Sequence, residues 1–102
     1  MNRRAKGNRN ELKAVKELEA DGYITYRVKG STNRFQKNVD IFGLFDILGK
    51  RKEQMIWVQV KSNKKPSLKP FVEFYKKYCS GLDSVEIWVY KDRKGVEKHQ
   101  IK

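Results

Sequence analysis

The chain has 102 residues, with 24 Lys or Arg against 12 Asp or Glu, so its formal charge is +12. This length predicts one domain over residues 1–102. The charge favours polyanionic partners, nucleic acid before a membrane surface, and the alternative is a basic protein whose charge only aids solubility. The single cysteine excludes an internal disulfide, and no apolar run approaches the roughly 20 residues of a membrane span. We expect a cytoplasmic protein without a membrane partner.

The first nine residues contain four cations and no acid, which predicts a flexible basic arm over residues 1–9. The arm is either a phosphate-binding tail or a solubilising terminus, and the overall charge favours phosphate. Its cationic residues are Arg3, Arg4, Lys6 and Arg9.

A helix is expected over residues 10–21, with Asn10 or Asn8 as its cap and Gly22 at its end. Apolar residues recur at helical spacing along one stripe of this segment. Glu11 lies on the same stripe, so its carboxylate points inward, towards whatever the helix packs on. The simpler alternative is an acid that suits the positive end of the helix dipole.

A strand is expected over residues 23–28, followed by a polar loop over residues 29–38. Polar loops of this kind carry contacts, so phosphate or groove binding is the functional interpretation and a plain connector the alternative. The loop cations are Lys29, Arg34 and Lys37, and a second basic connector, residues 62–69, contains Lys64 and Lys65.

The centre of the chain predicts a β-hairpin whose arms are residues 39–48 and 55–61, the first possibly broken at Gly43. If Gly49 faces Ile56, then Asp46 faces Gln59, and opposed residues have Cβ atoms about 5 Å apart. Gln59 and Lys61 share one face, because side chains alternate along a strand. Asp40, by the same pairing, falls beyond the partner strand and is the weaker site candidate.

The remaining segments predict a helix that ends near Ser80, a strand over residues 84–90 and a short strand over residues 96–101. The aromatic stripe of that helix, Phe71, Phe74, Tyr75 and Tyr78, is expected in the core. The element order gives an α/β fold with a central mixed sheet flanked by helices, and one parallel crossover near the C-terminus.

The hairpin groups an acid, an amide oxygen and a lysine on one face, with Glu11 able to approach from the first helix. There is no Cys/His cluster for zinc, no Gly-rich phosphate loop and no nucleophilic serine signature. Carboxylate, amide and backbone carbonyl oxygens suit Mg²⁺, with Mn²⁺ as a substitute. A divalent ion beside a lysine in a basic protein outlines a site for phosphodiester hydrolysis.

The spacing of Asp46 and Gln59-Val60-Lys61, with Glu11 upstream on a helix, resembles the PD-(D/E)XK nuclease core. The longer pattern resembles archaeal-type and viral Holliday junction resolvases, over roughly residues 7–90. Its elements are Gly7 to Glu11, Gly22-Tyr23, Arg27 with Gly30-Ser31, Gly43-Leu44-Phe45-Asp46 and Gln59-Val60-Lys61-Ser62.

The resemblance implies a restriction-endonuclease-like fold, a homodimer and Mg²⁺-dependent symmetric cutting of four-way DNA junctions, in the host cell interior if the chain is viral. It implies that Glu11, Asp46, Gln59 and the Val60 carbonyl bind metal and that Lys61 is the catalytic lysine. Ser31 would lie near the scissile strand, and Arg9 and Arg27 would hold phosphates.

Two residues depart from the family pattern. Gln59 stands where an acid is usual, and its amide oxygen brings no negative charge, so metal affinity should fall and Glu11 should matter more. Phe45 stands in place of the proline, which alters the backbone rather than the ligands. Two alternatives stay open: another structure-specific or nicking nuclease of this fold, and a non-catalytic nucleic-acid-binding module with a decayed site.

Overall fold

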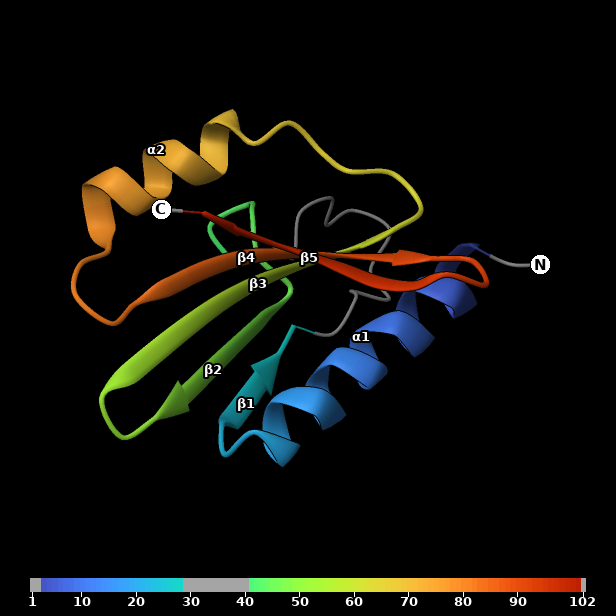
Figure 1. Cartoon of the computed structure of the whole chain (residues 1–102), viewed down its shortest axis with the longest axis horizontal. Coiled ribbons are helices and arrows are strands. Elements are labelled where there is room, and N and C mark those ends of the chain that lie inside the picture. The colour runs from blue at the N-terminus through green and yellow to red at the C-terminus, as the bar shows by residue number, and fades with distance from the viewer. Residues whose placement is uncertain (1–2, 29–40, 102) are drawn as a thin grey trace, which may run out of the picture.

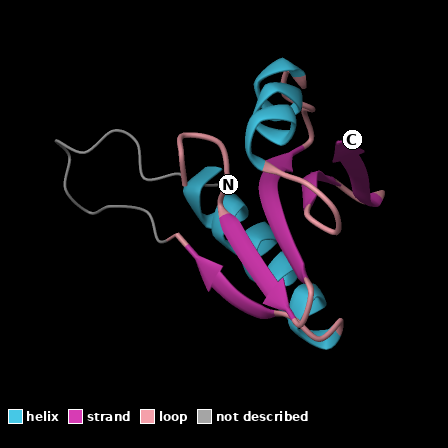
Figure 2. Cartoon of the chain, turned by 90° about the vertical axis from the view of Figure 1, so that its left-hand side faces the viewer, coloured by secondary structure: helices cyan, strands magenta, loops and turns pink. Residues whose placement is uncertain are grey.

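The computed structural model describes residues 3–28 and 41–101, which form one five-stranded sheet with a helix against each face (Figure 1). The side view in Figure 2 shows the two helices lying apart from each other. The elements in chain order are α1 (Arg3–Ala20), β1 (Ile24–Arg27), β2 (Ile47–Arg51), β3 (Gln54–Ser62), α2 (Lys69–Tyr78), β4 (Ser84–Lys91) and β5 (Gly95–Ile101).

The sheet is mixed, as the sequence predicts, and its strands follow one another in chain order, β1-β2-β3-β4-β5. The β3–β4 pair is parallel and is joined through α2, whereas the other three pairs are antiparallel. The predicted hairpin register is confirmed, since Gly49 pairs with Ile56. The C-terminal ends of β1, β3 and β4 therefore lie at the same end of the sheet as the N-terminus of β2.

Two apolar clusters lie on opposite faces of the sheet. The α1-side cluster contains Ala14, Leu18, Tyr23, Ile47, Ile56, Val58, Val60 and Trp88. The α2-side cluster contains Phe45, Phe71, Phe74, Val85, Ile87, Val89 and Ile101. The alternation along β3 and β4 produces this division, because neighbouring residues of a strand face opposite sides. Tyr78 is an exception to the predicted core stripe of α2, since its side chain is 71% exposed.

The first helix begins earlier than the sequence predicts. Residues 3–9 belong to α1, so the predicted flexible arm is wrong for them. Arg, Ala and Lys are good helix formers, and the single Gly7 costs only about 1 kcal/mol within a helix. Asn8 and Asn10 are consequently not caps: their side chains bind Arg27 and Ser62 instead.

The second strand begins later than the sequence predicts, at Ile47 rather than residue 39. Residues 41–45 form a tight turn closed by a bridge between Ile41 and Phe45. Phe42 and Gly43 both have positive φ, 53° and 70°, in this turn. Left-handed backbone cannot continue a strand, which explains the shortening. Within the described ranges, neither helix combines the length and apolar character that crossing a membrane requires.

Candidate active site

The regular pairing of β2 with β3 stops before Asp46, and this irregularity lies at the candidate site. Phe45 belongs to the α2-side cluster and Ile47 to the α1-side cluster, although residues two apart in a strand share a face. Asp46 lies between them as a bend, outside the β2–β3 ladder, which ends at the pair of Ile47 with Val58. An extra residue of this kind acts as a β-bulge, which redirects a side chain. The predicted ladder pairing of Asp46 with Gln59 is therefore not formed.

Asp46 instead holds the end of the sheet through three hydrogen bonds. Its N–H donates to the Val58 carbonyl at 2.9 Å, and its carbonyl accepts from the Val28 N–H at 2.9 Å. Its carboxylate Oδ2 accepts a hydrogen bond from the Val60 N–H at 2.9 Å. Asp46 as a residue is only 9% exposed, and its carboxylate thus takes the place of a backbone partner for β3.

The part of β3 beyond the ladder carries two oxygen atoms that bear on the candidate site, the Val60 carbonyl and Gln59 Oε1. In a strand the N–H and C=O of one residue point towards the same neighbouring strand, so the Val60 carbonyl faces the side on which Asp46 binds. Gln59 is 7% exposed, and its Oε1 is buried with no hydrogen-bond partner among the described residues. A buried acceptor without a partner costs about 1–3 kcal/mol, so a ligand or water that bound this oxygen would recover that cost.

Glu11 reaches the same end of the sheet from α1. Its Oε1 accepts a hydrogen bond from Arg27 Nε at 3.0 Å, and Arg27 Nη2 donates to Asn8 Oδ1 at 2.7 Å. Asn8 and Glu11 are three residues apart and so lie on one face of the helix. Arg27 thereby ties the end of β1 to α1, and this pair was not predicted from the sequence.

A second link between α1 and the sheet runs from Asn10 to Ser62. Asn10 is 6% exposed, and its Nδ2 donates to Ser62 Oγ at 2.8 Å. The bond joins the residue before Glu11 to the residue after Lys61. Both links hold the first half of α1 to this end of the sheet. Glu11, Asp46, Gln59, Val60 and Lys61 therefore belong to elements that meet at one end of the sheet, while their grouping into one site stays a prediction.

Some of the predicted cationic residues lie on α1, on β3 and in the connector after β3, and others lie outside the described residues. Lys61 is exposed, and it follows Gln59 by two positions, so the two share the α2-side face of β3. Arg9 is exposed on α1, and Lys64 and Lys65 are exposed in the connector after β3. Arg3, Arg4 and Lys6 lie in the first turns of α1. Ser31, Lys29, Arg34 and Lys37, as well as Asp40, lie outside the described residues.

The donor atoms at the bulge fit a hard divalent cation in type. Asp46 supplies a carboxylate, Gln59 an orphaned amide oxygen and Val60 a backbone carbonyl, and oxygen donors are what Mg²⁺ selects. Among residues 3–28 and 41–101, no three His, Cys, Asp or Glu side chains converge to hold a metal ion. A metal bound here therefore relies on amide and carbonyl oxygens in addition to carboxylates.

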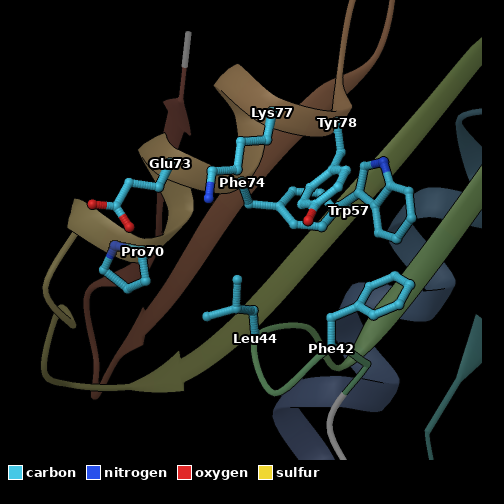
Figure 3. Close-up of a pocket in the computed structure, with 8 residues that line it drawn as sticks. All are labelled: Phe42, Leu44, Trp57, Pro70, Glu73, Phe74, Lys77 and Tyr78. Carbon is cyan, nitrogen blue, oxygen red and sulfur yellow. The ribbon is translucent and has the colours of Figure 1, made fainter.

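An aromatic pocket of about 640 Å³, which was not predicted from the sequence, lies between α2 and the turn that precedes Asp46 (Figure 3). Phe42 and Leu44 of the tight turn face α2 across it, and Trp57 forms its wall on β3. Phe42 is 72% exposed and lies 6.0 Å from Trp57 and 5.9 Å from Phe74, between ring centroids. The signal in the sequence was the Phe-Gly pair, which suits a turn better than a strand.

No family model matches the chain, and no curated protein matches it in sequence. Among solved structures, the chain is similar to Hjc, a Holliday junction resolvase from the archaeal hyperthermophile Archaeoglobus fulgidus. The TM-score is 0.60 at 19% sequence identity, over 91% of this chain and 70% of that chain. The expected α/β fold of the restriction-endonuclease type is therefore confirmed at the level of the fold.

Proposed function

We propose that this chain is a divalent-metal-dependent endodeoxyribonuclease that cuts four-way DNA junctions, and so resolves recombination or replication intermediates. The observation that supports this best is the break at Asp46, whose buried carboxylate binds the Val60 N–H at the end of β3, in a chain of charge +12. Gln59, the residue before Val60, adds a buried amide oxygen without a hydrogen-bond partner among the described residues. The fold shared with an archaeal junction resolvase supports the same proposal.

The metal would be Mg²⁺, or Mn²⁺ as a substitute, held by Asp46, Gln59 Oε1 and the Val60 carbonyl. Glu11 would be a further acid, kept at this end of the sheet by its ion pair with Arg27. The bound ion would lower the pKa of a water and stabilise negative charge on the phosphate. Asp46 also holds the Val60 N–H, so its carboxylate would fix the strand edge that carries the other two donors.

Lys61 would act on the phosphate directly. Its exposed ammonium shares a face of β3 with Gln59, so it would stabilise charge that develops on the phosphoryl oxygens and orient the attacking water. Ser31 would lie near the scissile strand. We propose Arg27 as a positioning residue first and a phosphate contact second, because its Nε and Nη2 are already bonded to α1.

The surrounding cations would hold the DNA backbone. Their contacts would release counterions, so affinity should fall as salt rises. The proposed phosphate contacts are Arg3, Arg4, Lys6, Arg9, Lys29, Arg34, Lys37, Lys64 and Lys65.

We propose that the protein acts as a homodimer through the aromatic pocket face, Phe42, Trp57, Phe74 and Tyr78. Phe42 and Tyr78 are exposed beside the less exposed rings of Trp57 and Phe74, and an exposed apolar patch is typical of interaction surfaces. A two-fold dimer would bury the same face of each chain. Phe42 also adopts a left-handed backbone, a strained state for a bulky residue, which supports a role for its exposed ring.

Light scattering after gel filtration tests the dimer. The double variant Phe42→Asn/Tyr78→Ser should shift the mass from dimer to monomer, and asparagine tolerates the positive φ at position 42. Leu12→Ser, which removes an exposed apolar side chain from α1, is the control and should remain dimeric. A double variant that keeps the dimer mass would exclude this face.

The function is tested with an end-labelled four-way junction and a linear duplex of matched sequence, each in Mg²⁺ and in EDTA. The proposal predicts paired, symmetric nicks on the junction in Mg²⁺ alone. Products that are not confined to symmetric nicks across the junction would favour another structure-specific or nicking nuclease of the same fold.

A second candidate is a non-catalytic nucleic-acid-binding module, which Gln59 favours because the site lacks the usual second acid. A Mn²⁺ titration followed by electron paramagnetic resonance separates the two. The nuclease predicts a Mn²⁺ site that Asp46→Asn weakens, whereas the binding module predicts no such site.

A further inference from the structure

A polar pocket of about 210 Å³ lies where α1 meets the turn between β4 and β5, on the α1 side of the sheet. Three cations and one acid line it, together with the buried amide of Asn10. The lining residues are Asn10, Lys13, Tyr90, Lys91, Asp92, Arg93 and Gly95. The volume suits one small polar group, and the excess of cations favours an anion.

The turn that carries two of these cations is held in one shape. Asn63 and Asp92 bond reciprocally: Asn63 Nδ2 donates to Asp92 Oδ2 at 3.1 Å, and the Asp92 N–H donates to Asn63 Oδ1 at 2.8 Å. Arg93 and Gly95 have positive φ, 61° and 82°, as the tight turn requires. Lys91 and Arg93 are therefore presented by a fixed turn, which reduces the entropy lost on binding.

The pocket is connected to the candidate active site through the end of β3. Ser62 pairs with Tyr90 in the parallel ladder, and the Asn63 N–H donates to the Tyr90 carbonyl at 2.9 Å. Asn10, which lines the pocket, binds Ser62, the residue that follows Lys61. One nucleic-acid backbone crossing this end of the sheet could thus meet both Lys61 and the pocket.

We infer that Lys13, Lys91 and Arg93 form a binding site for a backbone phosphate of the nucleic acid, away from the scissile phosphate. The inference rests on the proposed function for its ligand but not for the chemistry of cutting. Lys13 approaches from α1 and the other two from the turn, so one phosphate would bridge two elements. The bidentate fork of Arg93 suits a phosphate in particular.

The test measures junction affinity in EDTA, where no cutting occurs, as a function of salt. The double variant Lys91→Gln/Arg93→Asn removes both turn cations, and asparagine tolerates the positive φ at position 93. A plot of the logarithm of the association constant against the logarithm of the salt concentration has a negative slope. Loss of one phosphate contact should make that slope about 0.9 less steep. The same relation gives a dissociation constant about eightfold higher at about 0.1 M salt.

The control, Lys52→Gln/Lys76→Gln, removes the same charge from two exposed positions that do not line the pocket. Its affinity should change less than twofold. Equal losses in both double variants would overturn the inference, because net charge alone would then explain them.

Lys13→Gln alone gives an independent reading, since α1 does not depend on the turn for its shape. It should also weaken junction binding several-fold, and unchanged binding would contradict the bridging site. A titration with inorganic phosphate, followed by the Gly95 amide resonance, distinguishes a site for any phosphate from one that needs the polymer. If the junction is cut normally while the turn variant binds like wild type, this inference fails and the proposed function stands.

Discussion

The two ends of the β2–β3 hairpin differ in what satisfies the backbone of β3. At the turn end the ladder is regular, with Gly49 opposite Ile56 and Arg51 opposite Gln54. At the other end the ladder stops at Val58, and the carboxylate of Asp46 replaces the missing backbone partner of Val60. The regular end therefore serves stability, whereas the broken end places polar atoms where a sheet alone would not.

We expect the largest effect on the cutting rate from replacing one of two exposed lysines, which lie at the two ends of this hairpin. Lys61→Ala should lower the rate of junction cutting by about 10²–10³-fold, because a group that stabilises transition-state charge is lost. Lys52→Ala, in the hairpin turn, should change the rate less than twofold. Single-turnover cutting at saturating protein measures both, and gel-shift affinities should be nearly equal. Comparable rates for the two variants would contradict the assignment.

The regular end is tested by adding a methyl group at Gly49. A Cβ there would lie 2.6 Å from Ile56 Cγ2 and 3.1 Å from Tyr23 Cδ1, both in the α1-side core. Gly49→Ala should lower the free energy of unfolding by about 1–3 kcal/mol. Urea denaturation measures the loss. The folded variant should still cut junctions at the wild-type rate. A lower rate with unchanged stability would contradict the assignment of the regular end to stability alone.

The broken end is tested by Gln59→Glu, which places a negative charge at a buried oxygen that has no hydrogen-bond partner among the described residues. Without metal the added carboxylate is buried, since Gln59 is only 7% exposed, so the melting temperature in EDTA should fall. With Mg²⁺ the melting temperature should rise more than it does for wild type, since binding to the folded state stabilises it. Asp83→Asn, on the turn before β4, is the control, and Mg²⁺ should shift its melting temperature as it shifts that of wild type. Equal shifts with Mg²⁺ in wild type and Gln59→Glu would argue against Gln59 as a ligand position.

The smallest expected effect concerns Tyr90, opposite Ser62 in the ladder. Burial, with Glu17 as a second cause, raises its pKa from the ordinary value of 10.0 to about 12. The folded state holds the proton more tightly, so this contribution to stability is complete below pH 10 and is lost as pH rises from about 10 to 12. The difference in tyrosinate absorbance between wild type and Tyr90→Phe measures the shift. An absorbance difference that titrates near pH 10 would exclude the raised pKa of Tyr90.

The fold was largely predictable because local periodicity agrees with the final packing. The alternation along residues 84–90 predicts the two faces that the structure separates, with Val85 on the α2 side and Trp88 on the α1 side. The register of the hairpin followed from the pairing of Gly49 with Ile56. The start of α1 was missed because Asn8 and Asn10 resemble caps, and only the tertiary structure shows that they bind Arg27 and Ser62.

The faces on which the candidate residues of β3 lie were predictable, but the geometry around Asp46 was not. Spacing along β3 put Gln59 and Lys61 on one face, as observed. Spacing also predicted Asp46 directly opposite Gln59, whereas the bulge turns its carboxylate towards Val60. A bulge adds one residue to one strand, and its position depends on backbone partners across the sheet, which no local pattern of apolar residues specifies.

The most direct test of the account is Asp46→Asn in the junction assay, with binding and single-turnover cutting measured on the same protein in Mg²⁺ and in EDTA. We predict that the variant folds and binds the junction as wild type does, because the amide oxygen can still accept the Val60 N–H, while metal-dependent cutting is lost. Cutting at the wild-type rate, or wild-type cutting that persists in EDTA, would show that the broken end of the hairpin is not a metal-dependent catalytic site.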